Sequence, residues 1–243
     1  MEIQGLNTLL GMYDSLVFFD VETTGFDPDS CQMIELAGIR ASQSGTIDFD
    51  EFIELQAGHE LPQKIEDLTG ITPLHLVGAP SEEMAIGMFA EKMMVGKTLL
   101  VAHNAQFDLN FLGAAYVKHR KELPDLLKAF FEADYLDSLT VFRDRKPAPH
   151  KLLDAIKKYG LEGKVQNSHR AIDDARALYE VVRKMAEERD DLHEYINIFG
   201  YDPRYEISGK TLKKVEYLAQ GTSNFFLSSD KILPTRAKGG GKT

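Results

Sequence analysis

The sequence predicts an α/β domain in which a mixed five-stranded sheet, first an antiparallel meander and then parallel strands, is flanked by helices. Three short strand patterns joined by turn-rich links open the chain. Strand patterns then alternate with helical ones, which is typical of a sheet with helices on its faces. With 243 residues, 43% of them apolar, the chain is long enough to bury one substantial core.

The antiparallel part of the sheet is predicted at residues 16–19, 34–41 and 47–55. The first of these is an apolar Leu-Val-Phe-Phe run that ends abruptly in Asp20 and Glu22, where a loop begins at residues 23–25. Turn residues at 27–30 separate the first strand from the second, and the third strand partly alternates between apolar and polar residues. Short links of this kind favour an antiparallel meander.

From residue 81 onwards, stretches with the apolar spacing of helices alternate with strand-like stretches. Ser81 is expected to cap a helix whose apolar residues lie on one face, with Glu82 and Glu83 near its positive end. Apolar residues then recur at i, i+4, i+7 and i+8 from Phe107, which predicts another helix. The other predicted elements are strands at 98–102 and 133–136, a short helix from 152 to about 160, and a long helix over roughly 168–190.

The charge distribution divides the chain in two. The net charge is −10, but residues 209–243 carry +5, so residues 1–208 carry −15. Turn-forming residues at 202–203 and 208–209 break the helical pattern after about residue 190. The predicted domain covers residues 1–190, and residues 191–243 form a basic C-terminal extension with a disordered end. An acidic domain of this kind does not bind nucleic acid through bulk positive charge, although carboxylates that hold metal ions would still allow it to act on phosphate.

The single cysteine and the start of the chain predict the compartment. Cys31 has no partner for an internal disulfide, which favours a reducing, cytoplasmic setting. The first residues lack the basic and apolar regions of a secretory signal, and no apolar run approaches the roughly 20 residues that span a bilayer. We therefore expect a cytoplasmic protein without a membrane partner.

Two acids at the end of the first strand are the first indication of chemistry. Asp20 and Glu22 follow apolar residues, and positions i and i+2 of a strand point to the same side. Two adjacent carboxylates repel each other and lose hydration, and a cation between them removes both costs. The alternative is a solvated strand end with two surface acids.

Acids from two other segments strengthen this interpretation. Asp108 lies in the first turn of a predicted helix, and Asp174 lies beside the packing stripe of the long helix that His169 is expected to open. Each alone fits an ordinary surface role. Together, four carboxylates suit two Mg²⁺ (or Mn²⁺) ions, and a histidine near neutral pKa suits proton transfer from water. The set predicts phosphodiester hydrolysis.

A family resemblance rests on three ordered segments: residues 18–26 (FFDVETTGF), 103–108 (HNAQFD) and 169–174 (HRAIDD). They resemble the motifs of the DEDDh 3′–5′ exonucleases of the ribonuclease H-like superfamily. The likeness is greatest to the proofreading exonuclease of bacterial DNA polymerase III, in its epsilon-subunit and PolC-type forms. It extends over roughly residues 14–190, and its His-x4-Asp spacing selects Asp174 rather than Asp173 as the ligand.

The resemblance implies a role for each motif residue. Asp20, Glu22 and Asp174 would hold one metal ion, Asp20 and Asp108 the second, and His169 would be the general base. The residues expected to contact the terminal nucleotide are Thr23, Thr24, Gly25, Phe26, His103, Asn104 and Phe107. Phe26 would stack on or wedge against a base, whereas Phe107 could equally belong to the helix core.

The resemblance also implies an activity. It predicts a metal-dependent exonuclease that releases nucleoside monophosphates from single-stranded or frayed 3′ ends of DNA, in proofreading or end trimming. An RNA exonuclease of the ribonuclease T or oligoribonuclease type is the alternative, and a non-catalytic replication adaptor is a remote one. A DNA polymerase or a sliding clamp is the expected protein partner.

Three hypotheses concern the C-terminal extension. Residues 215–218 and 225–227 could form a β-hairpin. Gln220 followed by Phe225 loosely resembles the clamp-binding peptide of epsilon subunits. The basic charge could also guide nucleic acid towards the acidic domain.

Overall fold

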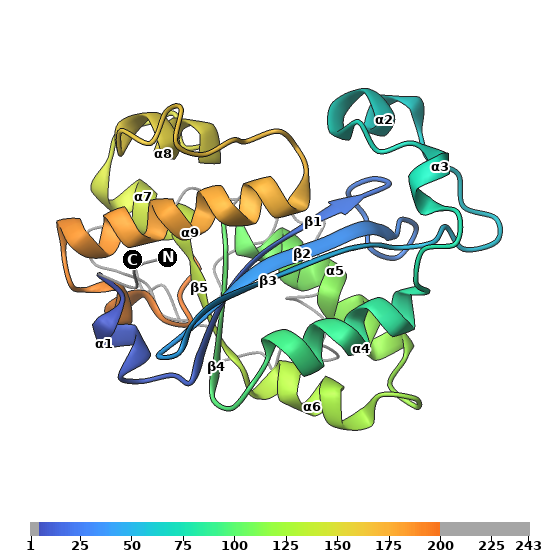
Figure 1. The fold of residues 1–243 in the computed structure, drawn as a ribbon, viewed down its shortest axis with the longest axis horizontal. Helices are drawn as coiled ribbons and strands as arrows, with labels where there is room; N and C mark the ends of the chain where they lie inside the picture. The colour runs from blue at the N-terminus through green and yellow to red at the C-terminus, as the bar shows by residue number, and fades with distance from the viewer. Residues whose placement is uncertain (1–4, 200–243) are drawn as a thin grey trace, which may run out of the picture.

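The computed structural model describes residues 5–199, which form a mixed sheet with helices on both faces (Figure 1). The strand order is β3-β2-β1-β4-β5. The strands are β1 (Ser15–Thr23), β2 (Met33–Ser42), β3 (Gly45–Phe52), β4 (Thr98–Ala102) and β5 (Asp134–Asp137). β1, β2 and β3 pair antiparallel, whereas β4 is parallel to β1 and β5 is parallel to β4. The predicted fold class is confirmed.

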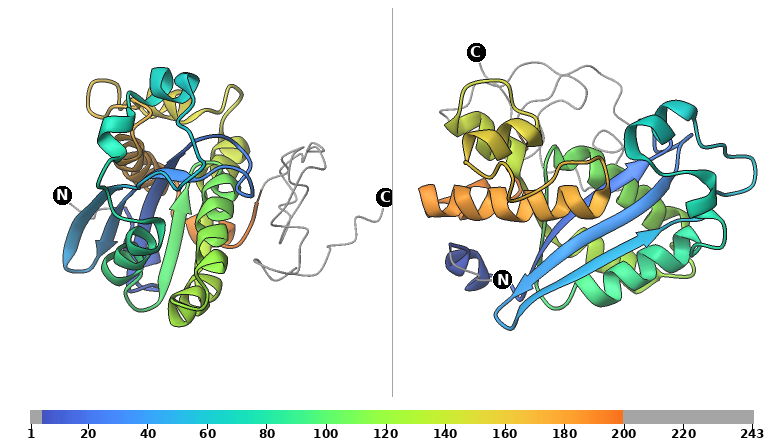
Figure 2. Two further views of the ribbon diagram at one scale, coloured as in Figure 1. Left: turned by 90° about the vertical axis from the view of Figure 1, so that its right-hand side faces the viewer. Right: turned by 45° about the horizontal axis from the view of Figure 1, so that its top comes forward.

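Ten helical segments complete the part of the chain that the structure describes. They are α1 (Asn7–Leu10), α2 (Gln63–Thr69), α3 (Pro73–Leu76), α4 (Glu82–Met93), α5 (Ala105–Lys118), α6 (Pro124–Glu132), α7 (Ser138–Arg145), α8 (Leu152–Lys158), α9 (Ala171–Glu188) and the 3₁₀ helix η1 (Leu192–Tyr195). Figure 2 shows the sheet lying between these helices.

The central strand β1 divides the interior into two apolar cores. Its residues 16–19 are fully buried, and because side chains alternate along a strand, they supply both faces. Leu16 and Phe18 pack in one core with residues of α9, whereas Val17 and Phe19 pack in the other with residues of α4 and α5. A strand held on both faces in this way gives the acids at its end a fixed position.

A smaller apolar cluster holds α2 and α3 beyond the end of the sheet. It consists of Ile34, Ile65, Ile71 and Leu76. Figure 1 shows the two helices beside the outer ends of β1 and β2. Leu74 and Val77 of this region are 82% and 75% exposed, so the cluster is thin.

Six helical segments were not expected from the sequence, namely α1, α2, α3, α6, α7 and η1. Four of them have only four to seven residues, and so short a segment shows too little hydrophobic period and depends on tertiary packing for its stability. α6 begins at Pro124 and α7 begins after Asp137, whose side chain accepts hydrogen bonds from Leu139 N and Thr140 N. A proline at the first position of α6 and an aspartate at the N-cap of α7 are helix-start signals that the sequence analysis did not use.

The packed chain continues beyond residue 190, where the extension was predicted to begin. Tyr195 is buried in the α9-side core, and Asn197 exchanges hydrogen bonds with the backbone of Tyr135 on the edge strand β5. The ring of Phe199 stacks on that of Tyr135, with centroids 4.2 Å apart and an interplanar angle of 11°. The predicted hairpin, the clamp-binding peptide and the basic stretch all lie outside the described residues.

Among the helices of residues 5–199, none is both long and apolar enough to cross a bilayer.

We predict that Phe199→Ala lowers the free energy of unfolding by about 3–5 kcal/mol, because the side chain is fully buried and stacked. Urea unfolding measures this change. Leu74→Ala is the matched control, and its effect should stay within about 0.5 kcal/mol because Leu74 is exposed. Equal effects of the two substitutions would show that residues 191–199 do not belong to the cooperative unit.

Candidate active site

The structure brings the predicted acids together at the C-terminal end of β1. The ligand atoms of Glu22, His169 and Asp174 lie within 4.8 Å of one another. Asp108 Oδ1 accepts a hydrogen bond of 3.2 Å from the backbone N–H of Val21, so this carboxylate lies against the β1 backbone between Asp20 and Glu22. Segments as far apart as β1, the first turn of α5 and the first turn of α9 therefore form one cluster.

The local structure of β1 directs its two acids towards α9. Asp20 and Glu22 share a face with Phe18, whose ring packs edge-on against Tyr179 of α9 at 5.1 Å. The pairing of β1 with β2 then shifts between Glu22 and Thr23, where the register has an irregularity. The strand is thus regular up to Glu22, and Thr23 pairs with Met33 in a shifted register.

A buried carboxylate from β5 holds the start of α5, and with it Asp108. Asp137 Oδ1 accepts hydrogen bonds from Asn104 N (3.0 Å) and Ala105 N (3.2 Å). Asn104, the residue before α5, has the left-handed φ of 67° and makes no side-chain cap. The sequence analysis missed this role of Asp137. Its position directly before α7 signals a cap of that helix, but no local pattern indicates its bonds to the start of α5.

His169 lies outside the helix that it was expected to open. α9 begins at Ala171, and His169 has a left-handed φ of 56°. In a continuous helix, residues i and i+5 point about 140° apart, so His169 and Asp174 would face different directions. The left-handed turn removes this conflict and brings the imidazole near Asp174. The expected helix start was therefore wrong, and the departure from helical geometry is what assembles the site.

The pKa values of three of the acids are raised because they are buried close to one another. Burial, followed by the charges of Asp108 and Glu22, raises the pKa of Asp20 well above its usual value. Burial also raises the pKa of Asp108, although the hydrogen bond from Val21 N opposes the shift. Burial and then the charge of Asp174 raise the pKa of Glu22 to about 9. The cluster is therefore short of positive charge.

Asp174 adds a more direct indication of a ligand. Its Oδ1 atom is buried and has no hydrogen-bond partner within the described part of the chain. Burial raises its pKa to about 6, against the opposing effects of Asn167 and His169. A buried carboxylate oxygen without a partner is costly. Because carboxylate oxygens are the ligands that hard divalent cations prefer, a divalent cation fits this donor set.

The loop that follows β1 presents Phe26 to solvent, 68% exposed. Its ring lies edge-on to Phe107, with centroids 6.4 Å apart, and Lys64 Nζ of α2 lies 5.5 Å from its centre. Phe107 also contacts Phe111 at 5.1 Å, so it belongs partly to the core and partly to the surface beside Phe26. An exposed aromatic ring next to an acid cluster is suited to stacking on a base.

The rest of this loop is held by internal hydrogen bonds. Thr23 Oγ1 donates to the carbonyl of Gly25 (2.5 Å), and Thr24 pairs with the backbone of Gln32 through both its N–H and its hydroxyl. A Cβ atom at Gly25 would lie 2.6 Å from Cys31 Sγ, so the loop can adopt this path only with glycine there. The position of Phe26 is thus set by its neighbours.

His103 makes contacts that differ from those of a pocket residue. Its Nδ1 lies 2.9 Å from Ser138 Oγ and its Nε2 lies 2.9 Å from the carbonyl of His150. Burial lowers the pKa of the ring. Because both nitrogens have protein partners, His103 ties α7 and the loop before α8 to the end of β4, and only its ring face is left for a nucleotide.

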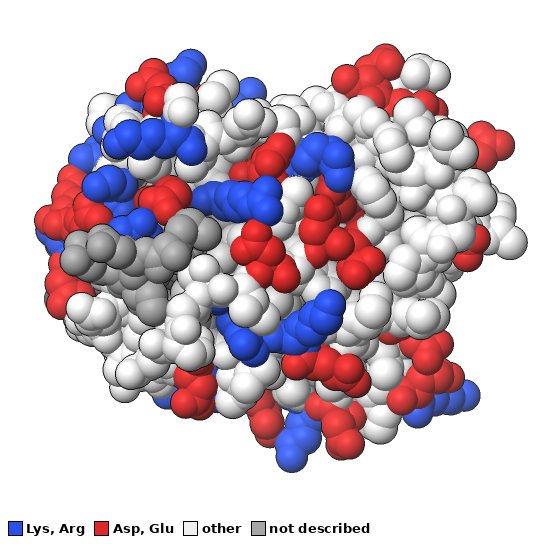
Figure 3. All heavy atoms as spheres, viewed as in Figure 1, with Lys and Arg blue, Asp and Glu red and all other residues white. Residues whose placement is uncertain are grey.

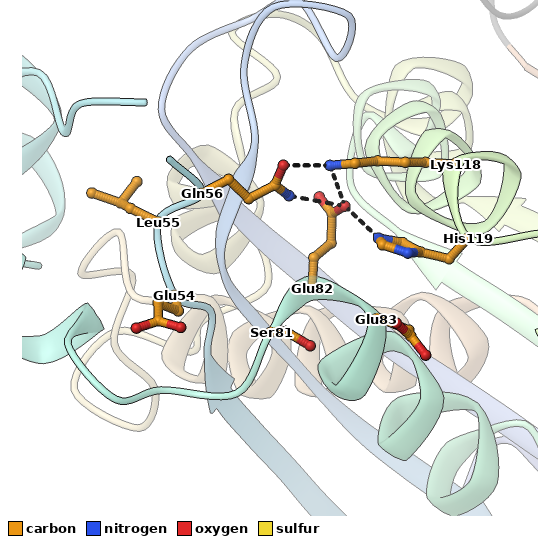
Figure 4. Close-up of a pocket in the computed structure, with 8 residues that line it drawn as sticks. All are labelled: Glu54, Leu55, Gln56, Ser81, Glu82, Glu83, Lys118 and His119. Atoms are coloured by element: carbon orange, nitrogen blue, oxygen red, sulfur yellow. Dashed lines mark hydrogen bonds and ion pairs between the residues drawn. The ribbon is translucent and has the colours of Figure 1, made fainter. Parts of the chain in front are cut away.

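A second hollow of about 190 Å³ lies apart from these residues and is lined by none of them. Figure 4 shows that Gln56, Lys118 and His119 converge on Glu82. Glu82 Oε2 accepts hydrogen bonds from Lys118 Nζ at 2.8 Å and His119 Nε2 at 3.0 Å. The charge of Glu82 is therefore balanced within the protein by Lys118.

The outer surface next to the site is acidic. Figure 3 shows Asp and Glu side chains gathered where α9 crosses the strands, with a few basic side chains among them. Asp48 on the edge strand β3 is one of the exposed acids, and Arg176 of α9 pairs with it at 2.8 Å. A broad basic surface is absent from this face.

The family model for exonucleases of the RNase_T type matches residues 17–182. The chain belongs to this exonuclease family. The predicted resemblance is confirmed, and so is the expectation of an enzyme that hydrolyses phosphodiester bonds.

Several relatives carry the name DNA polymerase III PolC-type. The one from Clostridium perfringens is 33% identical over 183 residues, which cover 73% of this chain and 12% of the relative. The one from Bacillus subtilis is 35% identical over 191 residues, with 76% and 12% covered. This chain therefore spans about one eighth of the length of these relatives.

Solved structures share the fold at lower identity. Escherichia coli exonuclease I in complex with a dA16 oligonucleotide has a TM-score of 0.63 at 19% identity, covering 75% of this chain and 42% of its own. Cell-death related nuclease 4 has a TM-score of 0.60 at 15% identity, covering 72% and 64%. One exonuclease I structure is described as a zinc-bound form. These likenesses support the ribonuclease H-like fold.

The raised pKa values predict that the metal-free protein loses stability as the pH rises. The pKa of Glu22 is raised from 4.5 to about 9 on folding, so its protonated form stabilises the folded state. That contribution is complete below about pH 4.5 and is lost as the pH rises through 9. The free energy of unfolding should fall over this window by at most about 1.4 kcal/mol per pH unit for this group.

Glu22→Gln should flatten this dependence and raise stability at pH 8, as measured by urea unfolding in the presence of EDTA. The matched control is Glu60→Gln, at an exposed glutamate, which should leave the pH dependence unchanged. A metal-free wild type that becomes more stable between pH 5 and 9 would contradict the electrostatic description of the site.

Proposed function

We propose that the chain is a metal-dependent 3′–5′ exonuclease that releases nucleoside monophosphates from single-stranded or frayed 3′ ends of DNA. The observation that carries the proposal is the convergence of Glu22, His169 and Asp174, with their ligand atoms within 4.8 Å. The names of the relatives, DNA polymerase III PolC-type, support DNA as the substrate and proofreading or end trimming as the role.

The four acids would hold two divalent cations, Mg²⁺ or Mn²⁺. Asp20, Glu22 and Asp174 would share one ion, and Asp20 and Asp108 the other. Bound ions of this kind lower the pKa of water and stabilise the charge that develops on the leaving oxygen. The buried Asp174 Oδ1 without a protein partner and the raised pKa values of the other acids support this assignment.

His169 would act as the general base. Its ring is exposed at the edge of the acid cluster, beside Glu22 and Asp174, where it would reach both solvent and a water molecule bound to the metal. Neighbouring carboxylates stabilise the imidazolium that forms when the ring accepts the proton. The proton can then pass to bulk water, because the ring is not enclosed.

The loop after β1 would bind the terminal nucleotide. Phe26 would stack on the base of this nucleotide. Phe107, which lies edge-on to Phe26, would pack against the Phe26 ring and hold it in position. Thr23, Thr24 and Gly25 would contact the sugar and phosphate, together with Asn104. Stacking on an aromatic ring does not distinguish one base from another, so little sequence preference is expected.

The acidic charge of the domain is compatible with this substrate. Metal ions held by carboxylates supply positive charge only at the scissile phosphate, so a basic surface is not required. A DNA polymerase or a sliding clamp is the proposed partner, as the PolC-type relatives suggest. The single cysteine supports a cytoplasmic location.

A single digestion experiment tests the polarity and the substrate. Single- and double-stranded DNA and RNA, labelled at either end, are incubated with the protein and Mg²⁺. We expect 3′-labelled single-stranded DNA to release labelled mononucleotide at once, and 5′-labelled DNA to shorten progressively. EDTA should stop both reactions. Faster digestion of RNA would favour the ribonuclease alternative, and no digestion of any substrate would favour the adaptor hypothesis.

We predict that His169→Ala lowers kcat by roughly 10²–10⁴-fold, because it removes the group that accepts the proton of water. Steady-state kinetics on single-stranded DNA at neutral pH measure the effect. His193→Ala provides the control, since His193 is an exposed histidine of η1. A near-normal rate of the His169 variant would exclude it as the base.

A further inference from the structure

Glu35 is a fully buried carboxylate to which the proposed chemistry gives no part. It lies on β2 with no exposed surface, and the register of the sheet places it directly opposite Glu22 on β1. The two side chains therefore leave the sheet on the same face. Burying a carboxylate is costly unless hydrogen bonds and an opposite charge compensate it, so its partners explain its presence.

Both oxygens of Glu35 are bound by residues at the start of α9. Arg170 Nε lies 3.1 Å from Oε1 and 3.2 Å from Oε2, and Arg170 Nη2 lies 2.8 Å from Oε1. Ala171 N donates to Oε2 at 3.0 Å. Arg170 is the N-cap residue of α9 but makes no side-chain cap. A carboxylate from β2 thus caps this helix in its place.

These contacts fix the residue next to His169. Arg170 follows His169 directly and precedes Asp174 by four residues, and its guanidinium also lies 4.9 Å from the centre of the Phe52 ring. A left-handed conformation at a non-glycine residue such as His169 is strained and needs a restraint. The clamp on Arg170 provides a local restraint that holds His169 in this conformation, with its ring towards Glu22 and Asp174.

The same contacts also pair the guanidinium of Arg170, whose positive charge acts on Glu22 of the acid cluster. The charge of Arg170 opposes the rise in the pKa of Glu22 that burial and the neighbouring acids cause, so the two groups interact. A guanidinium released from Glu35 would lie among Asp50, Asp173 and Glu22, the other acids whose charges interact with it. An ion pair with Glu22 would compete with a divalent cation. In the folded protein, Glu35 takes the Nε–Nη2 edge of the guanidinium and leaves the oxygens of Glu22 to a metal.

We propose that Glu35 is a positioning residue that acts through Arg170: it holds His169 in place and keeps the arginine away from the metal-binding acids. This inference rests on the metal site proposed above. It assigns to a buried residue, 135 positions away from Arg170 in the sequence, control over both metal affinity and turnover.

The test uses the full chain and measures Mn²⁺ binding by isothermal titration calorimetry without nucleic acid. Glu35→Gln keeps the size of the side chain and removes its charge. We expect it to weaken Mn²⁺ binding by about 10- to 100-fold and, at saturating Mn²⁺, to lower kcat far more than it changes KM. Circular dichroism at the same temperature confirms that the variant is folded.

The matched control is Asp48→Asn. Asp48 also pairs with an arginine of α9, Arg176, at 2.8 Å, but on the exposed surface of β3. This variant should bind Mn²⁺ like the wild type. If Glu35→Gln behaves like the control in both Mn²⁺ binding and kcat, or loses only thermal stability, the inference is wrong.

The double variant Glu35→Gln with Arg170→Gln separates the two parts of the proposal. Without the competing guanidinium, Mn²⁺ affinity should return to within about twofold of the wild type, whereas kcat should stay low because His169 is no longer held. Mn²⁺ binding as weak as in the single variant would contradict the competition. A wild-type chain that binds no Mn²⁺ would instead contradict the proposed metal site itself.

Discussion

The mutual repulsion of carboxylates that the fold buries in one place is the constraint on which the rest of this structure depends. Asp20, Glu22, Asp108 and Asp174 come from three distant segments, and burial with their shared charge raises the pKa of each. Such a cluster opposes folding at neutral pH. It is tolerated because β1 is held between two apolar cores, and it becomes favourable when a cation supplies the missing charge.

The first turns of α5 and α9 are held in the same way, by carboxylates from the sheet. α5 and α9 each deliver one of the acids in their first turn, and each follows closely on a left-handed residue, Asn104 or His169. Neither helix has a side-chain cap of its own. Carboxylates from neighbouring strands, Asp137 for α5 and Glu35 for α9, accept the free N–H groups instead. The sheet thereby sets the position of both helix starts, and with them the distance between the acids.

An acidic domain is compatible with membership of an exonuclease family if the charges close to the site, rather than the net charge, control substrate binding. The outer face carries acids along β3 and α9, and residues 1–208 carry −15 in total. A polyanionic substrate would approach such a surface poorly at long range, so we expect contacts at the strand end itself to dominate binding. The exposed ring of Phe26 and the acids proposed to bind cations would provide contacts of this short-range kind.

The sequence by itself determined that an antiparallel meander precedes parallel strands, because alternation and spacing report on local structure. It also identified the three motif segments through their resemblance to a family, and with them Glu22, His169 and Asp174, which meet at the end of β1. It did not reveal that His169 lies outside α9, that both nitrogens of His103 have protein partners, or that the chain packs as far as Phe199. Glu35 stands in an apolar strand with no local sign of a role. Its partner is 135 residues away, and only the pairing of β1 with β2 and the packing of α9 bring the two together. Interactions across such separations depend on the tertiary fold, which no local pattern of residues encodes.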